Sequence, residues 1–114
     1  WGGIATYWQA EAQQAVAKKE DAVRAEVSQA SLSVESAAET VKAARKSLEL
    51  ASENLRLAEV GYREGVNTQL DVLSARTTLT GARTALSSAL KAYRMALAGL
   101  WKAEGSLVKR ILER

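Results

Sequence analysis

Large apolar residues recur at every seventh position over residues 27–62, and alanines follow three positions behind them. The large residues are Val27, Val34, Val41, Leu48, Leu55 and Tyr62, and the alanines are Ala30, Ala37, Ala44, Ala51 and Ala58. This spacing is that of the a and d positions of a coiled-coil heptad. The pattern weakens toward the N-terminus, where Glu20 and Gln13 fall on a positions. We therefore expect one helix over residues 4–64, whose second half contributes a coiled-coil seam.

The same heptad spacing recurs in the second half of the chain. The a positions are Val72, Leu79, Leu86, Tyr93 and Leu100, and the d positions are Ala75, Ala82, Ala89, Ala96 and Ala103. Alternation of large residues with alanine allows two helix backbones to approach closely. The pattern predicts a second helix over residues 69–104, an interruption at Gly105 and a short terminal helix over residues 106–114.

A short break separates the two repeats. Gly65 suits the left-handed position that ends a helix. Thr68, with Asp71 three residues later, resembles a capping box in which Asp replaces the usual Glu or Gln. A tip of only residues 65–68 forces the helices to be antiparallel neighbours. The predicted fold is all-α: residues 1–114 form a single fragment, a long antiparallel two-helix coiled-coil hairpin. With residue 66 as the pivot, residues 1–17 project past the partner helix.

Composition agrees with an all-α fold, because the chain has no Pro and is rich in strong helix formers. Residues 4–64 hold 8 basic and 10 acidic side chains, whereas residues 69–114 hold 8 basic and 3 acidic, so the two helices attract weakly. The net charge of the chain is only +3, and basic and acidic residues are interspersed along it, so no basic stripe for nucleic-acid binding is formed. No stretch resembles a transmembrane helix. A start at Trp1 suggests an excised or processed piece of a larger assembly.

The residues of common active sites are missing. Without His or Cys, the usual nucleophile–base pairs and zinc ligands are absent, so we expect no enzyme, no catalytic residue, no metal site and no cofactor. The pairs Glu35 with Glu39 and Glu49 with Glu53 read as a solvated helix face. Gly61 and Gly65 have the spacing of a membrane-helix dimer motif, but they lie among charges at a turn.

Further apolar or small residues lie outside the seam, where an isolated two-helix hairpin would not bury them. They are Ala43, Leu50 and Leu57 in the first helix and Ala85, Leu90, Ala92, Leu97 and Gly99 in the second. One interpretation is surface alanine chosen for helix propensity; the leucines favour additional packing partners. Tyr7 and Trp8 fit a membrane interface or contact with a missing domain equally well.

The segment around the break runs from Leu55 through Gly61-Tyr62-Arg63-Glu64-Gly65-Val66-Asn67-Thr68-Gln69-Leu70-Asp71-Val72-Leu73-Ser74-Ala75 to Arg76. This segment resembles the outer-membrane efflux protein family of TolC-like channels. Members typically have Tyr-x-x-Gly, a few polar residues and then Leu-Asp-Val-Leu-x-Ala. The resemblance continues through Tyr93 to Glu104-Gly105 and reaches back to Trp1-Gly2-Gly3, so it covers essentially the whole chain.

This resemblance implies a parent channel, a cellular location and a set of partners. Such channels are trimers with a β-barrel in the outer membrane of a Gram-negative-type envelope and a helical tunnel in the periplasm, and the chain is similar to the hairpin of the C-terminal half. It would touch the membrane only through that barrel. Its partners would be other copies of itself, a periplasmic adaptor protein and, indirectly, an inner-membrane transporter.

The resemblance also implies a functional tip, which docks the adaptor and helps gate the tunnel. The candidate residues are Tyr62, Arg63, Glu64, Gly65, Val66, Asn67, Thr68 and Asp71. Asn67 departs from the best-known member, where an arginine joins the closing network, so a charged latch is not expected here. Two other functions stay open: a structural or scaffolding coiled coil that is not a channel, and the α-hairpin of an adaptor protein.

Overall fold

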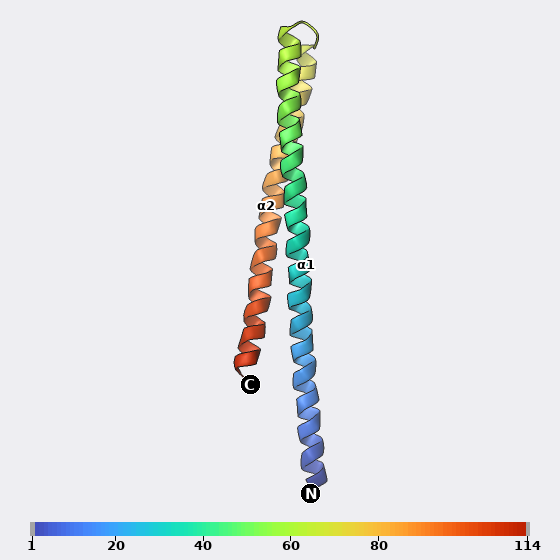
Figure 1. The fold of residues 1–114 in the computed structure, drawn as a ribbon, viewed down its shortest axis with the longest axis vertical. Helices are drawn as coiled ribbons and strands as arrows, with labels where there is room; N and C mark the ends of the chain where they lie inside the picture. Colours follow the sequence, from blue (N-terminus) through green and yellow to red (C-terminus); the bar gives the residue numbers. More distant parts are fainter. Residues whose placement is uncertain (1, 114) are drawn as a thin grey trace. The chain divides into compact units, whose positions relative to one another are not determined.

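The computed structural model describes residues 2–113, and both regular elements in that range are helices. Helix α1 spans Gly2–Arg63 and helix α2 spans Gln69–Leu112, joined by the turn at residues 64–68 (Figure 1). Good helix formers and the absence of proline let both helices run without a break. The predicted fold class, an all-α two-helix hairpin, is confirmed.

The chain divides into two compact units. One is Glu35–Met95, which contains the turn; the other combines the residues up to Val34 with those from Ala96 onward. In the first unit the C-terminal half of α1 lies antiparallel to the start of α2. Its most buried side chains occupy a and d positions: Val41, Ala51, Val72, Leu79 and Ala89. The heptad pattern therefore identifies the seam correctly.

The seam is thin. Among residues 2–113, no side chain is less than 2% exposed, and the most buried, Ala51, keeps 4%. Two helices cover each other on one side only, and alanine at d adds little apolar area. Most of the surface of both helices consequently remains open to solvent or to other partners.

Within the second unit, α1 continues past the end of α2 (Figure 1). Every described side chain before Glu20 is exposed, and the first buried one is Val23. Lys19, Ala22 and Val23 share a groove with Lys109 and Arg110. This pairing agrees with a pivot at residue 66 and confirms the expected overhang for the described residues 2–17. Within it, Tyr7 and Trp8 make an edge-to-face ring contact with centroids 6.3 Å apart, and both are exposed.

The expected interruption at Gly105 is wrong. Helix α2 runs through Gly105 and ends at Leu112, so residues 106–112 belong to α2; Arg114 lies outside the described residues. An interior glycine costs a helix about 1 kcal/mol relative to alanine, which flanking residues can offset. Here Leu107 and Arg110 are half-buried, so packing maintains the helix beyond the glycine. At the other end α1 already begins at Gly2, although glycine is a poor helix former; Trp1 is not described.

Candidate functional site

Gly65 ends α1 in the way the sequence predicts. It is the one residue with a positive φ among residues 2–113, at +80°. Its N–H donates to the Tyr62 carbonyl at 3.1 Å, and the Val66 N–H donates to the Gly61 carbonyl at 2.8 Å. These two bonds are the pair that defines a Schellman motif, with Gly65 at C′. Carbonyls that the helix end would leave unpaired are thereby satisfied.

The start of α2 is a complete capping box. The Thr68 N–H donates to Asp71 Oδ2 at 2.8 Å, and the Asp71 N–H donates to Thr68 Oγ1 at 3.2 Å. Asp71 also places a negative charge in the first turn, which the helix dipole favours. Asp therefore replaces Glu in this motif without loss of the reciprocal geometry.

Asn67 is the one partly buried residue between the helices. Its backbone N–H donates to the Gly61 carbonyl at 3.0 Å, and its side-chain Nδ2 donates to the Ala58 carbonyl at 3.3 Å. The neighbouring residues Glu64, Gly65, Val66 and Thr68 are exposed. The turn thus holds one side chain against α1 and presents the rest outward.

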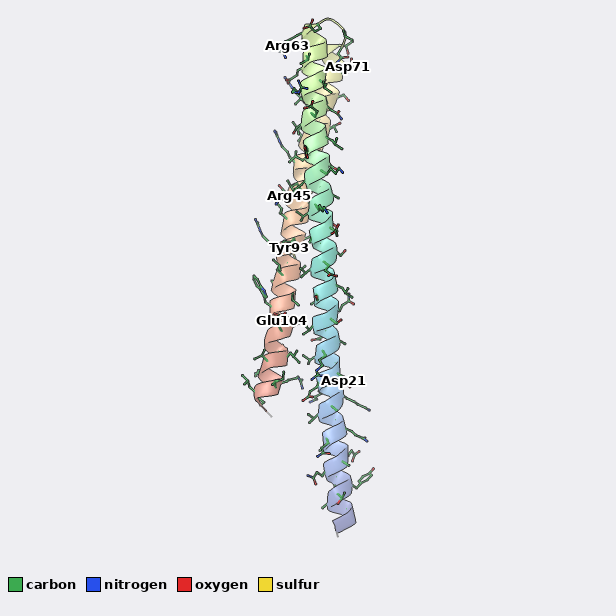
Figure 2. The ribbon with its side chains drawn as sticks, viewed as in Figure 1. Asp21, Arg45, Arg63, Asp71, Tyr93 and Glu104 are labelled. Atoms are coloured by element: carbon green, nitrogen blue, oxygen red, sulfur yellow. The ribbon has the colours of Figure 1, made fainter. Side chains whose placement is uncertain are left out.

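The eight predicted tip residues lie together at this end of the hairpin, where Figure 2 labels Arg63 and Asp71. Val66 is 81% exposed, and Arg63 and Asp71 are exposed as well. Tyr62 departs from the expectation of a seam residue, because it is 48% exposed. It lies in the last turn of α1, where the turn and the first residues of α2 replace a full facing helix.

A groove of about 780 Å³ lies beside the turn and is formed by both helices. Its lining is Glu59, Tyr62, Arg63, Gln69, Leu70, Val72, Leu73 and Arg76. Six of these, Glu59, Gln69, Leu70, Val72, Leu73 and Arg76, line the groove but are not among the predicted tip residues. The available signal was a pair of leucines, Leu70 and Leu73, that lie outside the heptad seam next to the break.

Two ion pairs lie at the groove and on the neighbouring face of α1. Arg76 Nη2 lies 3.6 Å from Glu59 Oε1, which links the two helices across the groove. Farther along α1, Arg56 Nη2 lies 2.6 Å from Glu53 Oε1. The hydrogen bond from Arg56 holds the pKa of Glu53 below its ordinary value. Both pairs are exposed, so each contributes little to stability.

The apolar residues outside the seam differ in exposure. Leu50 and Leu57 are 58% and 52% exposed, whereas Leu90 and Leu97 are half-buried. Met95 and Trp101 add further exposed apolar surface to α2. The face of α1 that the sequence singled out is therefore available for a partner.

The described residues hold neither a cluster of metal ligands nor a helix that could span a membrane. In residues 2–113 no three His, Cys, Asp or Glu side chains gather as a metal site would require. Neither described helix contains a stretch apolar and long enough to cross a membrane.

A family model described as outer membrane efflux protein matches residues 4–106. Because the match covers most of the chain, the chain belongs to this family, and the resemblance read from the tip motif is confirmed. Membership identifies it as a component of an outer-membrane efflux channel, a transport protein. No curated protein and no solved structure matches the chain.

Proposed function

We propose that this chain is a periplasmic tunnel segment of an outer-membrane efflux channel, and that its tip docks a periplasmic adaptor and helps gate the tunnel. The observation that carries the proposal is the groove beside the turn, which both helices line and where Leu70 and Leu73 lie exposed outside the seam. Membership in the efflux family supports the channel setting.

The tip offers a partner both apolar area and charge. Leu70 and Leu73 are 71% and 58% exposed at the groove, and Val66 is 81% exposed at the turn. A partner helix laid along this end could bury these side chains, as amphipathic helices do in apolar grooves. Arg63 on the same groove would fix the register of such a helix through an acidic partner residue.

The capped turn suits a docking surface, because a rigid loop loses little conformational entropy when a partner binds. The Schellman motif and the capping box fix the backbone on both sides of Val66. Glu64, Gly65 and Val66 are therefore presented in one conformation.

Gating would use the surfaces outside the seam. Leu50 and Leu57 would pack on neighbouring helices of the tunnel, including those of other copies in a trimer. Because the buried seam residues lie within one hairpin, a shift of the hairpin against its neighbours would leave their contacts in place. The inner-membrane transporter would act on the tip only through the adaptor.

A photo-crosslinking residue at Glu64 tests the docking proposal in the full-length parent, expressed in its own cells. Glu39 is the matched control, because it is also an exposed glutamate of the chain but lies far from the turn in sequence. We expect a periplasmic adaptor to be captured from position 64 and not from position 39. Capture of other copies of the chain alone from both positions, during active export, would favour a self-assembling scaffold coiled coil instead.

A further inference from the structure

Gly61 differs from the other described glycines. A Cβ added at Gly61 would lie 2.7 Å from Asn67 Cγ, closer than real Cβ atoms come to a neighbour. The three nearest atoms to that position all belong to the Asn67 amide. At Gly65, Gly81, Gly99 and Gly105 an added Cβ would meet nothing within 4 Å. Gly61 has an ordinary helical φ, so its missing side chain is explained by Asn67 and not by backbone conformation.

The apolar contact that usually accompanies a Schellman motif buries little area at this turn. That contact joins the C″ residue to C3 or C4 of the helix. Here C″ is Val66, which is 81% exposed and so buries little area against C4, Val60, and C3 is Gly61, which has no side chain. Apart from the backbone bonds to the Gly61 carbonyl, another side chain must hold the turn against α1. The Asn67 amide does so, because it lies over Gly61 and donates to the Ala58 carbonyl one turn earlier.

We propose that Gly61 and Asn67 form an interlocked pair in which the Asn67 amide occupies the space above Gly61 and fixes the reversal of the chain. Asn67 is then a positioning residue. Its side chain contacts α1 of its own hairpin, whereas the side chains of Glu64 and Val66 are exposed. This inference does not rest on adaptor docking, because it concerns contacts within one chain.

A double-mutant cycle on the 114-residue chain tests the pair. The variants are Gly61→Ala, Asn67→Ala and the combination, with the equilibrium constant of unfolding measured by denaturant titration at one low protein concentration. Loss of one net hydrogen bond predicts a rise of about fivefold for Asn67→Ala. Gly61→Ala must displace the Asn67 amide and lose its hydrogen bond, which offsets the gain in helix propensity, so this variant should be stabilised far less than Gly81→Ala. In the Asn67→Ala background the same Gly61→Ala change should stabilise more, since the obstructing amide is gone.

Two controls use other positions of the chain. Gly81→Ala adds a Cβ to an exposed helical glycine with open space around it and should stabilise in either background. Val66→Ala changes an exposed turn residue and should leave the unfolding constant nearly unchanged. A Gly61→Ala variant as stable as Gly81→Ala, or additive effects in the cycle, would overturn the proposal.

Asn67→Asp provides a second test if Gly61→Ala fails to fold. Aspartate keeps the size of asparagine but cannot donate to the Ala58 carbonyl when ionised. We expect the unfolding constant of Asn67→Asp at neutral pH to rise at least as much as that of Asn67→Ala. An unchanged constant would show that the amide hydrogen bond does not hold the turn.

Discussion

Replacement of Gly65 by valine is the sharpest perturbation of the turn. Gly65 has a φ of +80°, and an added Cβ would contact no atom within 4 Å. A Cβ therefore has room, and the loss of stability in an alanine variant must come from the backbone conformation. This separation of conformational strain from steric contact is what makes the position informative.

The magnitude follows from the conformation. An L-residue with a Cβ in the left-handed region costs roughly 1–2 kcal/mol relative to glycine. Replacement of glycine also restricts the unfolded chain, which offsets about 0.4–1 kcal/mol of that cost. Gly65→Ala should therefore lower the free energy of unfolding by about 1 kcal/mol. For Gly65→Val we expect about 2–3 kcal/mol, because β-branched residues resist positive φ most strongly.

The assay is denaturant unfolding followed by circular dichroism, on Gly65→Asn, Gly65→Ala and Gly65→Val at equal concentration. Asparagine tolerates the left-handed region, so it should be the least destabilised of the three. Equal stability across the series would refute the reasoning, since all three share the open space and differ chiefly in their tolerance of positive φ. A valine variant as stable as the parent would show that the turn adopts another conformation.

Three further outcomes are expected. Thr68→Ala removes the side-chain half of the capping box and should lower the free energy of unfolding by about 1 kcal/mol, measured by the same titration; an unchanged midpoint would mean that the cap is not formed. Leu79→Ala, at a seam leucine only 7% exposed, should cost about 2–3 kcal/mol, whereas Leu50→Ala, at 58% exposure, should cost far less; similar losses at both would contradict the seam assignment. The carboxyl pKa of Glu53, followed by NMR titration, should lie below that of an unpaired glutamate and rise in Arg56→Gln. Because the folded-state pKa is depressed, the small stabilisation is present above the unfolded-state pKa and fades as pH falls through the folded-state value.

Much of the fold could be read from local and repeated patterns. The a and d positions from Val27 to Ala103 are all buried or half-buried apart from Tyr62, because the heptad repeats often enough to define one face of each helix. The turn was predictable for a different reason. Gly65 and the Thr68–Asp71 pair act on backbone groups within a few residues of themselves, so their effect needs no distant partner.

Other features depended on residues brought together by the reversal of the chain. The groove needs Tyr62 of α1 and Leu73 of α2 at the same end, and the sequence order does not display that adjacency. Gly105 looks like a helix stop in isolation, yet packing of the flanking residues maintains α2 beyond it.

The contrast is clearest between two glycines of the same motif. The sequence alone determined the role of Gly65, because only the intrinsic preference of its backbone for positive φ was required. Gly61 has an ordinary helical backbone, and its need for a missing side chain arises from the Asn67 amide, six residues away. Only the tertiary structure decided that contact, since it depends on where the turn directs the Asn67 side chain.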